Sequence, residues 1–358
     1  MERFIQRTII IWILAFARMT EKTMFSKFDI ITFGSATRDL FLRSKDFKII
    51  DCADFVSGKA LALSAGSKVY LDDLIFATGG GGTNSAATFA LQGLKTVYAG
   101  LVGDDASGEE IVGELKNFGV KTDLVKKRKG AKTPFSVILS SGRERTILVY
   151  EGASHLLSQE DIDWGKIKKT KWFYISGLSG DSAKVFEPLI NFATERKIKL
   201  AVNPGKTQLT ANLEILKKCL DKIDILIVNQ EEANLIAGVD FKEESMLFKK
   251  FDELVPGLAV MSKGSEGVAV SDGQNVYRAG IPKSGYVDRT GSGDAFGSGF
   301  VAAIAQGQSV EEAIQLGTAN ATSCVQQVGA KNGLLKKGEW GKWEKVRVEI
   351  FRSRTSED

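Results

Sequence analysis

The regular alternation of short apolar runs with longer amphipathic segments between residues 83 and 328 is the feature that most constrains the fold. Runs such as residues 96–101 and 223–228 have the length and the β-branched content of buried strands. The segments between such runs have the length of helices. Strands that alternate with helices form parallel sheets, with the helices on the faces. The pattern therefore predicts an α/β fold with a doubly wound, mostly parallel sheet.

The first core strand is expected at residues 28–33, an apolar and β-branched run that stops at Gly34. The other strands expected in this sheet are residues 96–101, 172–175, 199–202, 223–228 and 258–261. The helices expected are residues 83–92, 108–118, 183–196, 231–237, 294–306 and 310–328.

Two segments, about 40–78 and 134–150, break this rhythm and show short alternating runs without a helical period. Within the second segment, Ser141-Gly142 between two apolar runs is a hairpin signal. The two segments are expected to form one small antiparallel sheet that acts as a lid. Ile138, Ile147 and Val149 supply apolar surface for pairing of two lids, which predicts a homodimer.

The composition excludes several classes of protein. With 358 residues, 43% hydrophobic and 26% charged, the chain is an ordinary globular protein large enough for one α/β domain and an accessory piece. A net charge of +4 from 48 basic and 44 acidic residues does not favour a nucleic-acid partner. Three distant cysteines fit a reducing cytoplasm, and His155 as the only histidine makes a Ser-His-Asp triad or a multi-histidine metal site a poor hypothesis.

The two ends of the chain are expected to lie outside the domain. The apolar run at residues 9–16 is too short to span a membrane and is not followed by a signal-peptide cleavage pattern, so no membrane partner is expected. Residues 1–23 are predicted to be an extension outside the fold, followed by one domain over residues 24–335. Residues 336–358 form a basic tail that is expected to be a surface helix.

A first glycine-rich loop, Gly79 to Gly82, follows a strand and opens a helix at Thr83-Asn84. Its amides can approach a ligand closely, and a helix N-terminus favours electronegative groups. A dinucleotide fingerprint would need glycine at Asn84, which argues against a nicotinamide-dependent oxidoreductase. Gly205-Lys206-Thr207 is not a P-loop either, because the preceding glycine of that motif is absent.

A second glycine loop runs from Asp288 through Gly291-Ser292-Gly293 to Asp294 and leads into the small-residue helix. Three small residues at a helix N-terminus form an anion hole suited to a transferring phosphoryl group. Asp294 stands where a carboxylate can accept a hydroxyl proton. Taken alone, a turn with a capping Asp is the more common interpretation of such a segment.

The two loops, in this order and about 210 residues apart by the sequence numbering, resemble the two signatures of the ribokinase-like (PfkB) carbohydrate kinase family. The resemblance covers residues 27–335 and includes the two lid segments. One departure is Arg289, where the family usually carries a small residue or proline. Further matching positions after the first loop are Asn84, Ala86, Gly93, Gly103, Asp104, Asp105 and Gly108.

The resemblance implies a three-layer ribokinase-like fold and assigns roles to residues of both loops. Asp294 would be the general base, with Gly291, Ser292 and Gly293 as the anion hole. The substrate hydroxyls would be bound by Asp39, Asn84 and the amides of Gly80, Gly81 and Gly82. A carboxylate together with an amide suits vicinal hydroxyls, which both donate and accept hydrogen bonds.

The resemblance also implies a nucleotide and a metal. ATP would lie beside Lys263, Gly264, Gly267 and Asn320. Asn229 and Glu232 would help to hold Mg²⁺, largely through water, although Asn followed by Glu three residues later is equally a helix capping box. Asp288 would lie beside a monovalent cation, and activation by K⁺ is expected.

The expected function is ATP-dependent transfer of a phosphoryl group to a hydroxymethyl group of a ribose-like or fructose-like sugar. A nucleoside kinase of the adenosine type, and a catalytically silent sensor of sugars or nucleotides, remain alternatives. Arg143 and Arg145 in the lid hairpin are placed to reach an acidic group on a substrate, but charged hairpin tips are usually solvated. A neutral substrate is therefore favoured.

Overall fold

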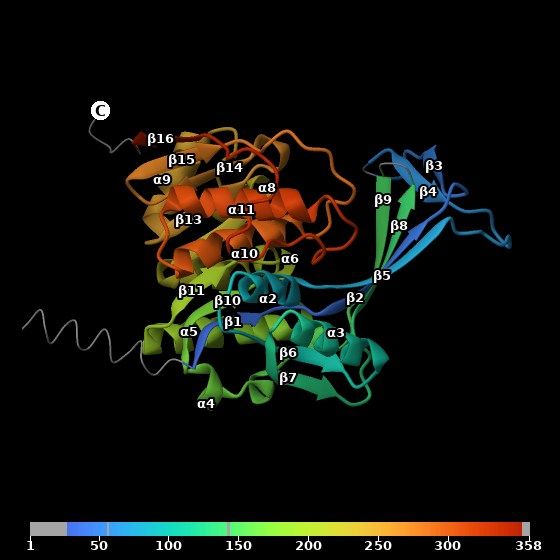
Figure 1. Ribbon diagram of the computed structural model, residues 1–358, viewed down its shortest axis with the longest axis horizontal. Helices are drawn as coiled ribbons and strands as arrows, with labels where there is room; N and C mark the ends of the chain where they lie inside the picture. The colour runs from blue at the N-terminus through green and yellow to red at the C-terminus, as the bar shows by residue number, and fades with distance from the viewer. Residues whose placement is uncertain (1–26, 56, 142–143, 353–358) are drawn as a thin grey trace, which may run out of the picture.

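The computed structural model describes residues 27–55, 57–141 and 144–352. The predicted extension at residues 1–23 and the prediction for Arg143 lie outside the described residues. The described chain forms an α/β body with a small sheet projecting from one side (Figure 1). Across these residues, no helix combines the length and the apolar character needed to cross a membrane.

The body is built on a ten-stranded sheet in the order β16-β15-β14-β13-β12-β11-β10-β1-β6-β7. The strands from β13 to β7 in this order pair in parallel, and β13 to β16 pair antiparallel at one edge. The bounds are β1 Phe28–Phe33, β6 Thr96–Gly103, β7 Lys121–Arg128, β10 Thr170–Ile175, β11 Lys199–Val202, β12 Ile225–Asn229, β13 Leu258–Ser262, β14 Val268–Ser271, β15 Asn275–Ala279 and β16 Val348–Arg352. The prediction of a mostly parallel sheet is confirmed.

Helices cover both faces of the sheet. Successive side chains of a strand point to opposite faces, and these strands are apolar on both, so both faces must be buried. In β1, Ile30 packs into a core with residues of α2, α10 and α11, whereas Ile31 packs into a second core with residues of α5, α7, α8 and α9. The longer helices are α2 Gly81–Leu91, α3 Ala106–Asn117, α5 Phe186–Arg196, α7 Leu213–Cys219, α8 Gln230–Ala237, α9 Glu244–Leu254, α10 Ser292–Ala305 and α11 Val310–Cys324. The three-layer arrangement is therefore confirmed.

The small sheet, called the lid from here on, has the strand order β5-β2-β8-β9, with a separate hairpin of β3 and β4. Its strands are β2 Thr37–Arg43, β3 Lys48–Asp51, β4 Lys59–Ala62, β5 Asp73–Gly79, β8 Phe135–Ser141 and β9 Glu144–Tyr150. The two predicted segments thus join in one sheet. The expectation of a purely antiparallel sheet is wrong, because β2 and β8 pair in parallel. These two strands come from different segments, so no hairpin turn fixes their direction.

The lid surface only partly matches the apolar face predicted for pairing. Ile147 and Val149 are 43% and 64% exposed, whereas Ile138 is 3% exposed and packs inward. Ile138 is therefore not available to a second lid. Homodimer formation stays a prediction.

The basic tail does not form the expected surface helix. Its end, β16, pairs antiparallel with β15 and extends the main sheet. The β-branched residues Val348 and Ile350 suit a strand, and the Arg278 guanidinium of β15 lies over the Phe351 ring at 4.8 Å. The edge strand β15 has backbone N–H and C=O groups that need hydrogen-bond partners, and a strand can supply them whereas a helix cannot.

Candidate active site

The two glycine loops meet where α2 and α10 begin, so their helix N-termini lie close together (Figure 1). Gly80 precedes α2 with φ 96°, and Gly291 precedes α10 with φ 78°, values that favour glycine at both positions. A Cβ atom on Gly81 would lie 2.7 Å from Ser176 Oγ and 3.5 Å from Asp294 Oδ1. The predicted substrate loop and the predicted base therefore lie side by side. The amides of Gly81 and Gly82 are not free for a substrate, because they donate to Ser35 Oγ at 3.3 Å and Ser35 O at 3.2 Å.

Asp294 receives a hydrogen bond from the amide of Asn84, with Nδ2 and Oδ2 2.8 Å apart. Removal from water raises the pKa of the Asp294 carboxyl, while Asn84 and the positive charge of Lys331 act in the opposite direction. The Oδ1 atom of Asn84 is buried and has no partner within the described chain. An unpaired acceptor beside a carboxylate is suited to a ligand that brings a hydroxyl donor.

Asp39 lies on the other side of the first glycine loop. It is 6% exposed, and burial raises the pKa of its carboxyl. A Cβ atom on Gly79 would lie 2.1 Å from Asp39 Oδ2, so only glycine leaves room for the carboxylate there. Asp39 is thus a buried acid and not an exposed turn residue.

The second loop uses one of its three amides itself, because Ser292 N donates to Arg289 O at 3.3 Å. A Cβ atom on Gly293 would meet nothing within 4 Å, and Gly293 is exposed. Gly291, in contrast, is packed so closely that a Cβ atom would lie 2.3 Å from the Cβ atom of Ala330. One glycine of the loop is fixed by packing, and the other faces open space at the start of α10. The start of α10 beside Gly293 is therefore open to a ligand, and the anion hole stays a prediction.

Asp288 is surrounded by donors from the protein. It accepts hydrogen bonds from Thr290 N at 3.0 Å, from Thr290 Oγ1 at 2.8 Å and from Gly329 N at 3.2 Å. The Arg145 guanidinium lies 3.3 Å away, and Arg289 instead stacks on Tyr286 at 4.2 Å. These donors and this charge offset the carboxylate without an ion, so the surroundings of Asp288 do not fit a monovalent-cation site.

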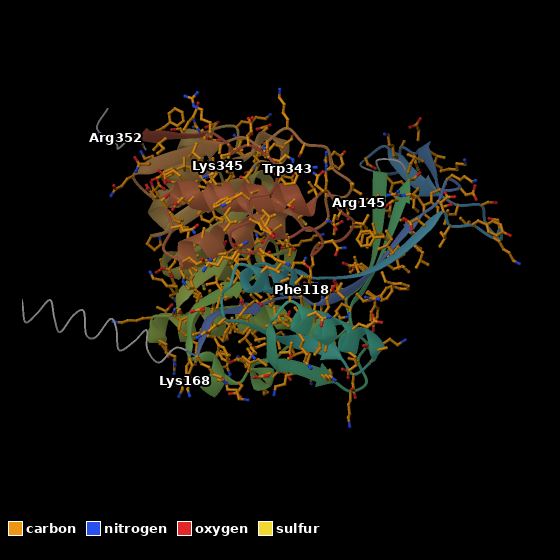
Figure 2. The ribbon with its side chains drawn as sticks, viewed as in Figure 1. Phe118, Arg145, Lys168, Trp343, Lys345 and Arg352 are labelled. Atoms are coloured by element: carbon orange, nitrogen blue, oxygen red, sulfur yellow. The ribbon has the colours of Figure 1, made fainter. Side chains whose placement is uncertain are left out.

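A cleft of about 750 Å³ separates the lid from the second glycine loop. Arg145 reaches across it from β9 and donates a hydrogen bond to Thr290 Oγ1 at 2.7 Å, on the side of the lid that faces the body (Figure 2). The predicted substrate ligand is therefore engaged with the protein itself. The cleft is lined by Phe41, Leu42, Arg43, Asp73, Ile75, Ser140, Arg145, Tyr286, Val287, Asp288, Arg289 and Val328.

Asn229 and Glu232 form a complete capping box at the start of α8. Asn229 N donates to Glu232 Oε2 at 2.8 Å, and Glu232 N donates to Asn229 Oδ1 at 2.9 Å. Burial raises the pKa of Glu232. The two residues therefore do form the helix capping box that the sequence also allowed. The second carboxylate oxygen of Glu232 has no protein partner in the described residues.

Lys263, Gly264 and Gly267 lie together in the turn between β13 and β14. Lys263 forms an ion pair with Glu244 at 2.8 Å. Gly267 has φ 98°, and a Cβ atom there would lie 2.0 Å from Ala279 O. The turn borders a cavity of about 280 Å³ that also touches Gly280.

Asn320 does not border a cleft. It is fully buried in α11, where its Nδ2 donates to Ala295 O at 2.8 Å and its Oδ1 accepts from Leu335 N at 2.9 Å. Through these hydrogen bonds the Asn320 side chain connects α11 to α10 and to the segment that follows α11. The prediction of a nucleotide contact is not supported, because both ends of the amide are already bonded in the core.

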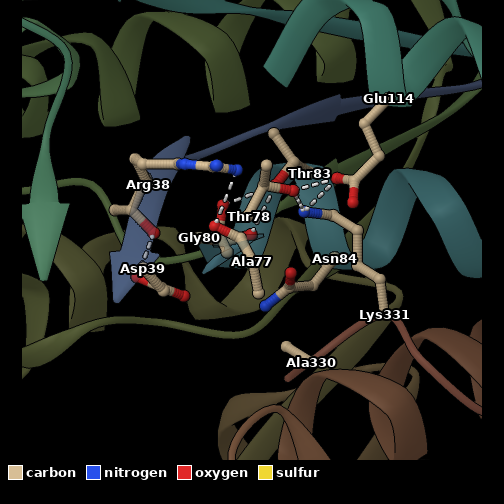
Figure 3. A network of polar contacts seen from close by, with 12 residues as sticks. Arg38, Asp39, Ala77, Thr78, Gly80, Thr83, Asn84, Glu114, Ala330 and Lys331 are labelled. Atoms are coloured by element: carbon tan, nitrogen blue, oxygen red, sulfur yellow. Dashed lines mark hydrogen bonds and ion pairs between the residues drawn. The ribbon is translucent and has the colours of Figure 1, made fainter. Parts of the chain in front are cut away.

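Lys331 was not among the predicted residues. It is 4% exposed and reaches from the segment after α11 to Thr78 Oγ1 and to Glu114, whose Oε2 lies 3.4 Å from Nζ (Figure 3). Thr78 also donates to Glu114. No spacing signal in the sequence distinguishes this lysine from the exposed Lys336 and Lys337 nearby.

Comparison with known proteins agrees with the family resemblance of the two glycine loops. The model of the pfkB family of carbohydrate kinases matches residues 32–337. The chain is 26% identical to the ribokinase of Lactococcus lactis over 289 residues, which cover 80% of this chain and 92% of that protein. It is 25% identical to the adenosine kinase of Saccharomyces cerevisiae over 305 residues, covering 80% and 88%.

Solved structures share the fold. The structure of Arabidopsis thaliana ribokinase complexed with ribose and ATP superposes with a TM-score of 0.71 at 23% identity, covering 87% of this chain and 96% of that one. Burkholderia thailandensis nucleoside kinase in complex with inosine gives a TM-score of 0.69 at 16% identity, with 87% and 95% covered. With the family model spanning most of the sequence, the chain belongs to the pfkB family of carbohydrate kinases and is a phosphotransferase.

Proposed function

We propose that this protein transfers the γ-phosphoryl group of ATP to a hydroxymethyl group of a neutral ribose-like or fructose-like sugar, with Asp294 as the general base. The observation that carries the proposal is the pairing of Asp294 with Asn84 at the N-terminus of α10. A partly desolvated carboxylate and the N-terminus of a helix then occupy one site. This is the combination that phosphoryl transfer to a hydroxyl requires.

In this mechanism, Asp39 and Asn84 hold the acceptor. The Asp39 carboxylate accepts hydrogen bonds from sugar hydroxyls, and the unpaired Oδ1 of Asn84 accepts another. The acceptor hydroxyl is directed toward Asp294, which takes its proton as the hydroxyl oxygen bonds to the γ-phosphorus and the bond from that phosphorus to ADP breaks. The amides of Gly291 and Gly293 stabilise the negative charge on the phosphoryl oxygens, and the Ser292 amide joins them when it exchanges its bond to Arg289 O for one to the ligand.

ATP as the donor is supported by the names of relatives, which include an ATP-dependent 6-phosphofructokinase 25% identical over 260 residues. Lys263, Gly264 and Gly267 would border the nucleotide. The free oxygen of Glu232 fits Mg²⁺ held largely through water, a hard cation that would neutralise charge on the ATP phosphates. Asn229 would orient Glu232 through the capping box.

The lid would close over the acceptor. Its strand β2 carries Asp39, and Arg145 of β9 bridges to the second glycine loop, so lid position and site geometry are linked. A closed lid excludes water, which otherwise competes for the phosphoryl group. Pairing of two lids through Ile147, Val149 and neighbouring exposed side chains would give a homodimer.

A nucleoside acceptor is the second candidate, since the adenosine kinase relative is nearly as similar as the ribokinase. A free sugar and a nucleoside both offer ribose hydroxyls to Asp39 and Asn84. The test is a coupled assay of ADP release with ATP and a panel of ribose, fructose, adenosine and 2-keto-3-deoxygluconate. Turnover with ribose or fructose is expected, turnover only with adenosine would favour the nucleoside kinase, and binding without turnover would favour a sensor.

A further inference from the structure

A buried lysine lies beside the acceptor site. Lys331 follows Ala330, whose side chain packs against Gly291 of the anion-hole loop. Its ammonium group extends away from that loop and reaches Thr78 at the end of β5 and Glu114 of α3 (Figure 3). Thr78 is the neighbour of Ala77, which pairs with Asp39 in the lid sheet. The lysine therefore joins the lid, α3 and the second glycine loop.

One carboxylate, Glu114, contacts this single ammonium group, and two more act on it by charge. Besides Glu114, the charges of Asp39 on β2 and Asp294 on α10 interact with Lys331. The other groups that face Asp294 are uncharged: Asn84 of α2, the Tyr174 hydroxyl of β10 and the Cys324 thiol of α11. On β2, Arg38 pairs with Glu110 at 2.8 Å and stacks on Phe76 at 4.9 Å, so its charge is shared with other groups.

The ion pair with Glu114 anchors Lys331, and the charge of the lysine also acts on two acids that are more deeply buried. Burying an ammonium group is costly, and an apolar side chain of similar length would fill the same space without that cost. Burial lowers the pKa of Lys331, and the three carboxylates oppose this shift. Glu114 keeps one third of its side chain exposed and has water to stabilise it. Asp39 is buried, and the carboxyl of Asp294 is desolvated, so these two gain most from the charge.

We propose that Lys331 is a positioning residue that serves as the common counter-ion of Asp39 and Asp294 and keeps both carboxylates ionised in the acceptor site. The inference rests on the proposed function. An ionised Asp39 accepts hydrogen bonds from the sugar, and an ionised Asp294 is free to take the proton. When ATP brings further negative charge, Lys331 offsets its effect on both acids.

The test is the pH dependence of kcat/KM for the best acceptor of the panel. In Lys331→Gln, which keeps a hydrogen-bond donor but removes the charge, the acidic limb should move to higher pH by about one unit, the size of shift that a nearby charge commonly produces. Lys331→Met should behave in the same way. Lys331→Arg should keep the limb of the wild type, and the exposed Lys336→Met is the matched control that leaves it unchanged.

An unmoved acidic limb in folded Lys331→Gln, even with a lower melting temperature, would show a structural anchor only and overturn the proposal. If neither neutral variant folds, Lys331→Met is combined with Glu114→Gln, which leaves no unpaired carboxylate at the ion pair. The acidic limb of the folded double variant should still move to higher pH, and an unmoved limb would overturn the proposal. Absence of turnover in the wild type with every acceptor would instead reject the proposed function.

Discussion

Asn84 and Asp294 are 210 residues apart in sequence, and their side chains are joined by a hydrogen bond of 2.8 Å. The bond connects the first turns of α2 and α10 and orients the carboxylate of Asp294. Because Asn84 donates through Nδ2, its Oδ1 is left for a ligand. One side chain thereby positions the proposed base and presents an acceptor to the substrate.

Asp294→Asn should lower turnover by about 10²-fold to 10⁴-fold, the usual contribution of a general base. The substitution preserves size and removes the ability to accept a proton. Binding of ATP should be nearly unchanged, which calorimetry can verify. Near-normal turnover in the folded variant would remove the central claim of the proposed function.

The same substitution should raise thermal stability in the absence of ligands at neutral pH. Burial raises the pKa of Asp294 above its unfolded value, so the ionised carboxyl disfavours the folded state at pH values above the folded pKa. Asn carries no such penalty. The gain in melting temperature should shrink as the pH falls through the folded pKa of Asp294, because the wild type then becomes neutral as well. A gain independent of pH would contradict this explanation.

Gly291→Ala and Gly293→Ala should change stability in opposite directions. At Gly291 the left-handed φ of 78° and the contact with Ala330 should cost about 1–3 kcal/mol. At Gly293, in the first turn of α10 and facing open space, alanine should stabilise the helix by up to about 1 kcal/mol. Chemical denaturation of both variants measures the difference, and equal effects would show that packing at Ala330 is not the constraint.

Because the Arg145 guanidinium lies beside Asp288, the activity of the enzyme should not depend on which monovalent cation is present. Wild-type activity is expected to be similar in K⁺ and in tetramethylammonium. Arg145→Ala should lose about 2- to 5-fold in the organic cation, because a half-exposed ion pair contributes at most about 1 kcal/mol, and K⁺ should restore the loss. Arg289→Ala is the control, since Arg289 contacts Tyr286 instead. Strong K⁺ activation of the wild type would show that an ion displaces Arg145 from Asp288.

Glu232→Gln should raise the Mg²⁺ concentration needed for half-maximal activity by about tenfold, as expected for a residue that contacts the metal through its waters. The amide oxygen of glutamine can still accept the capping hydrogen bond from Asn229 N, so α8 should stay intact. Glu231→Gln, at the exposed neighbouring position, is the matched control. Equal Mg²⁺ dependence in both variants would leave Glu232 with its capping role alone.

The sequence by itself determined the fold class and the positions where the two site helices begin. Both follow from local rules. Short, continuous apolar and β-branched runs mark the strands of the main sheet, and glycines with small neighbours mark the starts of α2 and α10. The same locality accounts for the errors at the C-terminal tail, where a short strand becomes stable only by adding to β15.

Only the tertiary structure decided which side chains face one another across the site. Lys331 contacts Thr78 and Glu114, which are both distant from it in sequence, and Arg145 meets Asp288 only because the lid lies against the second loop. The amide of Asn320, which the family resemblance places beside a nucleotide, is consumed inside the core. Burial and long-range pairing set these outcomes, and neither leaves a periodic signal in the sequence, since each depends on how distant elements pack.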